Sequence, residues 1–253
     1  MSADAIQRPP AGLKLAAVVC TYKRPKYLGW LINCFLEQDY PRELCEMVIL
    51  DDAGQYRDQA GDGWRLVSTA TRFPTLGDKR NAAIRLASDD VDAFCVWDDD
   101  DIYLPWALRA TAAALETAPW SRPSLVLHEH KGQRLRLRRH RTGGLYHGGW
   151  AYRRDVWSAV GGYPAASNGE DQRFAARLKR AGVAESDPIK LGFEPFYIYR
   201  WGPGTFHLSG MGPENSGYKR LAARPSAAAE LEIGWPVDYH AAEILPGVLP
   251  RPF

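Results

Sequence analysis

Short apolar runs alternate with amphipathic stretches along the first part of the chain. Three runs are almost continuously apolar, which predicts strands buried on both faces of a parallel sheet: residues 15–20, 46–50 and 92–97. Two stretches between them carry apolar side chains at helical spacing, which predicts helices over residues 26–37 and 77–87. This alternation indicates an α/β fold, in which helices flank a mostly parallel sheet.

The pattern changes in the second half of the chain. Four further elements are expected there: a helix over residues 105–117, a strand over 125–130, and helices over 153–160 and 169–181. Arginine and leucine alternate over residues 134–138, which predicts a strand with one basic, solvent-exposed face. Glycine, proline and aromatic residues dominate beyond about residue 200, so we expect a loop-rich C-terminal tail.

Composition is that of an ordinary globular protein. The chain has 253 residues, of which 45% are hydrophobic and 25% charged, and its formal net charge of +2 gives no global reason to expect a polyanionic partner. Its four cysteines form no Cys-x-x-Cys pair, so we expect buried free thiols in a reducing compartment. Because the polar N-terminus does not resemble a signal peptide and no apolar run is long enough to span a bilayer, a cytoplasmic location without a membrane span is predicted.

Polar clusters follow three of the predicted strands: residues 21–24, 51–52 and 98–101. Ligands of an open parallel sheet bind at the carboxyl ends of its strands, so we expect these clusters to converge on one site. Four adjacent carboxylates repel one another unless a cation neutralises them, and hard divalent cations often bridge carboxylates to phosphates. Asp98–Asp101 therefore predicts a Mg²⁺ or Mn²⁺ site for a diphosphate. The alternative is a solvated acidic turn in which Asp101 caps the next helix.

The segment WDDDDIYLP resembles the Asp-x-Asp region of GT-A fold glycosyltransferases, especially those of family 2. The segments VVCTYKRPKYL, VILDDAG and LGDKRNAAI precede it in the order found in that family. GGWAYRRDVWSAVGGYP and NGEDQRFAARL, which follow it, resemble the acceptor half of these enzymes. The resemblance covers about Leu15 to Leu178 and implies a GT-A, Rossmann-like fold.

The same resemblance implies a role for each matching residue in the donor site. Asp51 or Asp52 would bind the base, usually uracil, while Asp98 would contact the ribose side and, with Asp100, the metal that bridges the diphosphate. The remaining donor residues would be Thr21, Tyr22, Arg24, Lys79, Arg80 and, as a support for that loop, Asn81. Two departures stand out: Cys20-Thr21 replaces the proline-threonine of many relatives, and the four-aspartate run leaves the metal register ambiguous by one position.

Glu170-Asp171 matches the acidic pair that supplies the catalytic base in inverting members of the family. We expect Asp171 to be that base and Glu170 to orient the acceptor, because the chemistry needs a carboxylate within hydrogen-bond reach of the acceptor hydroxyl. The alternative is a charge pair that merely stabilises a helix N-terminus. His207 would complete the metal shell, as a histidine does in some GT-A enzymes, or would simply pack against Trp201 and Phe206.

Two groups of residues are candidates for the acceptor side. Trp150 and Tyr152, beside a glycine pair, would form a wall against which a sugar stacks, or would be ordinary core aromatics. The second group places six positive charges within eleven residues: Lys131, Arg134, Arg136, Arg138, Arg139 and Arg141. This group would be a solvated hairpin face or, through Arg134, Arg136 and Arg138, a docking surface for a nucleic acid or an acidic glycan.

The chain is therefore expected to form a single domain over residues 1–253, with three parts: a nucleotide-sugar-binding half at 13–101, an acceptor-binding half at 102–200 fused on the same sheet, and the tail at 201–253. The hypothesis is metal-dependent, inverting transfer from a nucleotide-diphosphate sugar, expected to be a UDP-sugar, to a hydroxyl of a glycan or a modified nucleic acid. One alternative is a sugar-phosphate nucleotidyltransferase, although the TYKRP loop lacks the glycines that such enzymes usually carry. The other is a non-catalytic sugar- or nucleotide-binding module.

Overall fold

The larger of two sheets carries the parallel strands that the sequence predicts. The computed structural model describes residues 12–130 and 137–201. Four strands run parallel in the centre of this sheet: β1 (Leu15–Thr21), β2 (Cys45–Asp51), β4 (Trp64–Ser68) and β5 (Ala93–Asp98). Its eight strands lie in the order β11-β7-β10-β5-β1-β2-β4-β3, with four short strands at the sides: β3 (Gln59–Gly61), β7 (Trp120–Ser121), β10 (Ala151–Arg153) and β11 (Glu185–Ser186).

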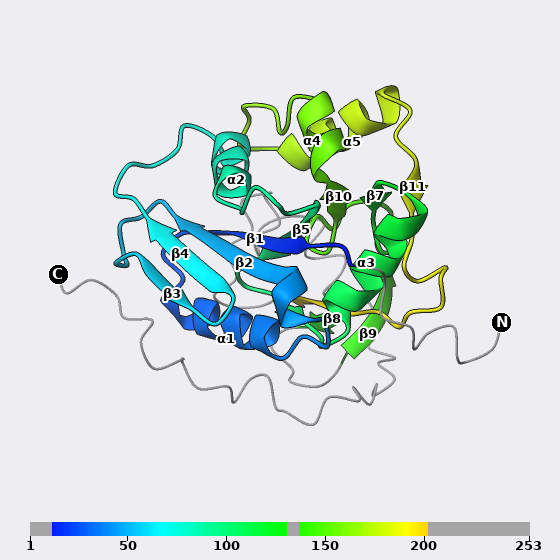
Figure 1. Cartoon of the computed structure of the whole chain (residues 1–253), viewed down its shortest axis with the longest axis horizontal. Coiled ribbons are helices and arrows are strands. Elements are labelled where there is room, and N and C mark those ends of the chain that lie inside the picture. Colours follow the sequence, from blue (N-terminus) through cyan, green and yellow to red (C-terminus); the bar gives the residue numbers. More distant parts are fainter. Residues whose placement is uncertain (1–11, 131–136, 202–253) are drawn as a thin grey trace.

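Helices cover both faces of this sheet because its central strands are apolar on both sides. In β1, Leu15, Ala17 and Val19 face one core, whereas Ala16 and Val18 face the other. The first core is covered by α1 (Pro25–Leu36) and α3 (Ala107–Thr117). The second is covered by α2 (Leu76–Arg85), α4 (Arg154–Ala159) and α5 (Glu170–Arg180), which lie together on the opposite face (Figure 1).

The residues after the acidic run add β7, β10 and β11 to the larger sheet and also form a second, four-stranded sheet. Its order is β6 (Ile102–Tyr103), β12 (Tyr197–Trp201), β8 (Leu125–His130) and β9 (Leu137–Arg141). The chain turns out of the larger sheet after β5, and β6 then pairs with β12, almost a hundred residues later. Local sequence patterns do not reveal such a distant pairing. The apolar residues of this sheet pack into the same core as α1 and α3.

The expected α/β fold is confirmed, and most of the expected elements are present within a few residues of their expected limits. β8 has the predicted bounds, whereas β9 begins at Leu137, and residues 131–136 lie outside the described part of the chain. The expected C-terminal tail lies almost wholly outside it as well. Among the described residues, no helix combines the length and apolar character needed to cross a membrane. A three-residue 3₁₀ helix, η2 (Arg42–Leu44), completes the elements.

Candidate functional site

The three polar clusters meet at the carboxyl edge of the larger sheet. In the strand register, Thr21 at the end of β1 lies opposite Asp51 at the end of β2, and Cys20 lies opposite Asp98 at the end of β5. The edge is therefore built by three neighbouring parallel strands whose next residues are polar. Helix α2 contributes two basic side chains to it, Lys79 and Arg80, as the contacts below show.

Asp51 and Asp52 have different surroundings at the end of β2. The Asp51 carboxylate is fully buried and accepts hydrogen bonds from Ser68 Oγ at 2.8 Å and from the backbone amides of Ala53 and Gln55 at 3.0 and 2.9 Å. It therefore shapes the turn after β2. The Asp52 carboxylate instead pairs with the ammonium of Lys79.

Lys79 ties together the ends of β1 and β2. Its Nζ donates to Asp52 and, at 2.6 Å, to the carbonyl oxygen of Thr21, and only 5% of the residue is exposed. Because both contacts are internal, Lys79 holds the two strand ends in place. The ammonium is directed at these two groups, and its effect on a bound donor would be that of a positive charge just beneath the edge.

Arg72, in the loop before α2, was not anticipated as a site residue. Its guanidinium carbon lies 3.6 Å from the ring centroid of Tyr22, which is a cation–π contact, and one of its nitrogens lies 3.8 Å from Asp52. The Arg72 side chain is 52% exposed, so this pair lies at the solvent-facing side of the edge. The sequence carried only a weak signal for it, a basic residue shortly before the LGDKRN segment.

The acidic run is held by two arginines and is not a solvated turn. Nη1 of Arg24 lies 2.6 Å from Asp99 Oδ1 and 2.9 Å from Asp100 Oδ2. Asp101 accepts from the Tyr197 hydroxyl at 2.6 Å and from the Arg200 amide at 2.8 Å, and Arg200 Nε donates to the Asp100 carbonyl at 2.7 Å. The alternative in which Asp101 caps α3 is wrong, because Trp106 holds the N-cap position without a side-chain hydrogen bond.

Burial sets the electrostatics of this run. Desolvation raises the pKa of Asp99 to about 6, with Arg24 opposing the shift, and it raises the pKa of Asp100 and Asp101 as well. The Asp98 side chain is 32% exposed, whereas those of Asp99 and Asp100 are 4% and 6% exposed. Asp98 is thus the member of the run that faces solvent at the strand edge.

The carboxylates of the run fit a divalent cation by their chemistry. Asp98 and Asp100 offer hard oxygen ligands, and burial raises the pKa of Asp100 although the nearby Arg24 opposes this shift. In the described part of the chain, no group of three or more His, Cys, Asp or Glu side chains surrounds a common point. A cation would thus have to complete its shell with water, substrate phosphate or residues outside that part, and His207 lies outside it.

Arg80 joins the acidic run to the predicted catalytic pair. One guanidinium nitrogen lies 3.7 Å from Asp98 Oδ1, and Nε donates to Glu170 Oε1 at 3.3 Å. Glu170 is 5% exposed, and burial raises its pKa against the opposing effect of Arg80. Asp171 is less buried, and its Oδ1 accepts from the amide of Gln172 at 2.7 Å. Both acids begin α5, after Gly169 in the left-handed region with φ of 67°.

Asn81 bonds to the segment before α5 and not to the donor loop that it was expected to support. Its Nδ2 donates to the carbonyl of Tyr163, and its Oδ1 accepts from the amide of the same residue, both at 2.9 Å. Trp157 Nε1 also donates to Oδ1, at 3.3 Å. One turn of α2 thus directs Lys79 to β2, Arg80 to the acids, and Asn81 to the loop before α5.

Trp150 and Tyr152 do not form a surface wall, so that expectation is wrong. Each is 1% exposed, and both belong to the core beneath α2 and α5. The reason is position: β10 lies between β5 and β7 inside the sheet, and Trp150 packs edge-on against Trp120 at 6.0 Å. In the basic segment, Arg138 lies in β9 opposite His128, Leu137 is buried, and Arg134 and Arg136 lie outside the described residues.

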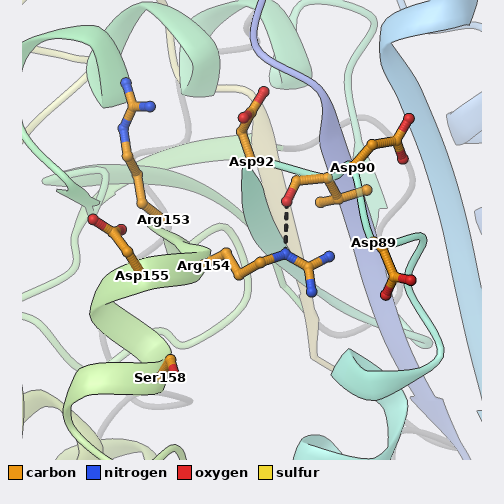
Figure 2. Close-up of a pocket in the computed structure, with 8 residues that line it drawn as sticks. Asp89, Asp90, Asp92, Arg153, Arg154, Asp155 and Ser158 are labelled. Atoms are coloured by element: carbon orange, nitrogen blue, oxygen red, sulfur yellow. Dashed lines mark hydrogen bonds between the residues drawn. The ribbon is translucent and has the colours of Figure 1, made fainter.

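A pocket of about 550 Å³ opens at the other end of the sheet, at the start of β5 (Figure 2). Both arginines that line it are hydrogen-bonded to backbone carbonyls. Arg154 Nε donates to the Val91 carbonyl at 2.7 Å, and Arg153 donates to the Leu115 carbonyl at 3.0 Å. Because the polar clusters lie at the carboxyl end of the same strand, this pocket is separate from the candidate site.

Solved structures with the same architecture include glycosyltransferases with bound nucleotides. S. aureus TarS 1–349 in complex with UDP-GlcNAc is 18% identical, with a TM-score of 0.60 over 76% of this chain and 60% of that one. The UDP complex of the same protein is 19% identical, with a TM-score of 0.56 over 76% and 61%. The mannosyltransferase PcManGT from Pyrobaculum calidifontis, in complex with GDP-Man and Mn²⁺, is 18% identical, with a TM-score of 0.54 over 78% and 58%.

At these identities the structural likeness establishes the fold, and the chain spans about 60% of the length of these neighbours. No curated protein sequence matches the chain. The sequence profile of glycosyl transferase family 2 matches residues 16–142, which contain β1, β2, β5 and the acidic run. With half of its residues matched by that profile and a GT-A-like sheet that carries the polar clusters at its carboxyl edge, this chain belongs to glycosyl transferase family 2.

Proposed function

We propose that the chain transfers a sugar from a nucleotide-diphosphate sugar to a hydroxyl group, with inversion at the anomeric carbon. The observation that carries this proposal is Arg80, which contacts a carboxylate of the acidic run, Asp98, and a carboxylate of the predicted catalytic pair, Glu170. Donor and acceptor would thus bind close to each other, as a direct displacement requires. A UDP-sugar is the favoured donor, because TarS was solved with UDP-GlcNAc and with UDP.

The nucleotide is proposed to bind over β1 and β2. Tyr22 and Arg72 would flank it, while Asp52 and Lys79 would fix the strand ends beneath it. Asp98 and Asp100 would hold Mn²⁺ or Mg²⁺, and PcManGT was solved with Mn²⁺. When bound, this cation would stabilise the leaving diphosphate. Arg24, which forms an ion pair with Asp100, would supply further positive charge nearby.

The acceptor hydroxyl is proposed to lose its proton to Asp171 as it attacks the anomeric carbon from the face opposite the diphosphate. Glu170, held by Arg80, would orient the acceptor beside it. The bond between the acceptor oxygen and the anomeric carbon forms as the bond to the diphosphate breaks. The acceptor is proposed to be a glycan or a hydroxyl-bearing modified nucleic acid, and within the basic segment Arg139 pairs with Glu194 at the surface.

Nucleotide binding tests the donor half of this proposal. Calorimetry should show that UDP binds in the presence of Mn²⁺, that a chelator weakens the binding, and that Asp100→Ala weakens it too. Asp90→Ala is a matched control, because Asp90 is an exposed aspartate at the opposite edge, paired with Lys14. Mass spectrometry across a panel of nucleotide sugars then identifies the donor that is hydrolysed. Full hydrolysis by chelator-treated protein would overturn the metal role of Asp98 and Asp100.

A further inference from the structure

We infer that Asn81 is a positioning residue for the acid pair Glu170-Asp171, acting through the loop of residues 161–169 that leads into α5. This inference rests on the proposed function, because it assigns the acid pair to the reaction. The loop belongs to the acceptor half of the sequence. Its backbone nevertheless bonds to Asn81 and Gly77 of α2, the helix that also carries Lys79 and Arg80, besides its bonds to α4 and α5. Asn81 would thereby connect the two halves of the site.

The Asn81 amide matches the loop backbone as a two-point clamp. It donates to the carbonyl and accepts from the amide of one residue, Tyr163, so both backbone polar groups of that residue are fixed. A third bond, from Trp157 of α4 to the same Oδ1, fixes the orientation of the amide. Gly162 has φ of 65°, and a Cβ there would lie 2.6 Å from Asn81 Oδ1, so the close approach depends on a glycine.

The first turn of α2 makes a second contact with the same loop. The Gly77 amide donates to the Ala166 carbonyl at 3.0 Å, and the Leu76 amide donates to Ser167 Oγ at 3.3 Å. Amides at the start of a helix lack acceptors within the helix, and the loop provides acceptors for these two. A Cβ on Gly77 would lie 1.9 Å from the carbonyl oxygen of Pro164, so the loop lies directly on the helix backbone.

The clamped residue is also fixed on its buried side. The Tyr163 hydroxyl lies 2.8 Å from His147 Nε2 and 2.9 Å from the Tyr152 hydroxyl. Its ring stacks on Phe174 of α5, with centroids 4.4 Å apart. Tyr163 therefore transmits the position of α2 to α5, whose first residue is Glu170. Arg80 precedes Asn81 in α2. Because the loop is held against α2, Arg80 lies within hydrogen-bond distance of Glu170.

The consequence is a role for Asn81 that does not require contact with substrate. If the clamp is released, the donor carboxylates stay in place, because they are held by Arg24, Tyr197 and Arg200. The acid pair loses its fixed distance from them. Nucleotide affinity should therefore be retained while turnover falls.

The test compares two lesions of the clamp with a control in the same helix. Asn81→Ala removes the hydrogen bonds. Gly77→Ala pushes the loop away through its Cβ and yet improves the helix propensity of α2, so a loss of turnover in this variant is not due to a weakened helix. Ala82→Gly is the control, because it weakens α2 by propensity and leaves both loop contacts intact.

Three measurements decide the outcome: calorimetry with UDP and Mn²⁺, steady-state hydrolysis of the best nucleotide sugar of the panel, and amide hydrogen exchange over residues 161–169. In Asn81→Ala and Gly77→Ala, we expect unchanged UDP affinity and donor KM, kcat lowered by roughly 10- to 100-fold, and faster exchange in the loop. Ala82→Gly should change none of the three.

Each other outcome has a definite meaning. Wild-type kcat in both clamp variants, with faster exchange in the loop, would overturn the positioning role and leave Asn81 as a structural residue. Unchanged exchange would overturn the clamp itself. A wild-type protein that neither binds UDP nor hydrolyses any nucleotide sugar would instead overturn the proposed function, and the exchange data would still decide whether the clamp exists.

Discussion

At the scale of single residues, the site depends on which charges are already paired inside the protein. The side chains of Asp51 and Lys79 bond to backbone groups within the protein. Those of Asp98 and Arg72 are partly exposed to solvent at the sheet edge. Glu170 is paired with Arg80, which leaves Asp171 as the less encumbered acid of the pair. This division favours Asp171 as the group that takes a proton and Glu170 as the group that is held.

Asp171→Asn is expected to lower transfer turnover by roughly 10²–10⁴-fold, the usual contribution of a general base. The amide keeps the shape of the carboxylate but does not accept the proton, so binding of UDP with Mn²⁺ should be unchanged. Turnover is measured as release of UDP from the identified donor, and affinity by calorimetry. A variant with near wild-type turnover would move the base to Glu170 or to another residue.

His147 predicts a pH dependence of stability. Burial lowers its pKa well below the ordinary value near 6.5, so the folded protein holds it neutral, while the unfolded chain takes up a proton below about pH 6.5. The folded state therefore has its full stability above the ordinary pKa of histidine, and protonation of the unfolded chain reduces the free energy of unfolding as the pH falls. His147→Gln should therefore lose less stability than the wild type between pH 7.5 and 5.5, by at most about 1.4 kcal/mol per pH unit. Urea unfolding at both values measures it, and identical pH slopes would contradict it.

Sequence reasoning found the charged members of the site because three polar clusters each follow a predicted parallel strand, and such strand ends meet at one edge of a sheet. It did not find Arg72, which carries no pattern of its own, and it misplaced Trp150 and Tyr152. An aromatic residue beside glycines looks the same in a sequence whether its ring faces a sugar or a core. Trp150 and Tyr152 are buried because β10 lies between β5 and β7 in the sheet. A strand of three residues is too short to be predicted from the sequence pattern.

At the scale of elements, the acidic run is shaped by the second sheet. Trp97, Tyr103 and Tyr197 form a stack, with ring centroids 4.1 and 5.2 Å apart, that lies at the turn between β5 and β6. The Tyr103 hydroxyl accepts from the Asp98 amide at 2.8 Å, and the Tyr197 hydroxyl donates to Asp101. Two hydroxyls of one aromatic stack therefore fix the first and last aspartates of the run.

Asp101→Ala should destabilise the fold, because it leaves the Tyr197 hydroxyl and the Arg200 amide buried without their acceptor. The expected cost is on the order of 1–3 kcal/mol per unsatisfied group. Asp101→Asn keeps one carbonyl oxygen and should cost less. Urea unfolding at pH 7 compares the two with Asp90→Ala, an exposed aspartate at the opposite edge. Equal stability of Asp101→Ala and wild type would show that β12 docks without these bonds.

The long elements were predictable from the sequence. The strands β1, β2 and β5 are continuous apolar runs, and the helices that cover them carry apolar residues at helical spacing. The short strands were not predictable. β6 and β7 have two residues each, and they exist because distant strands pair with them. Such pairing is decided by tertiary context and not by local propensity.

At the scale of the whole molecule, two sheets share one core and meet at the acidic run. The larger sheet supplies the strand ends, and the smaller one supplies Tyr197 and Arg200, which hold the run from its other side. The family profile matches residues up to 142, whereas Glu170 and the loop of residues 161–169 lie beyond that limit.

The contacts between Asp101 and β12 also have a consequence for folding. Asp101 and Arg200 are 99 positions apart, so closing this bond requires an ordered chain on both sides of a long loop. During synthesis the parallel strands β1, β2 and β5 are complete long before β12 leaves the ribosome. We expect the nascent chain to form its sheet first and to acquire the final shape of its acidic edge last, so that a chain halted before β12 would be folded in its first half but not yet able to hold a ligand there.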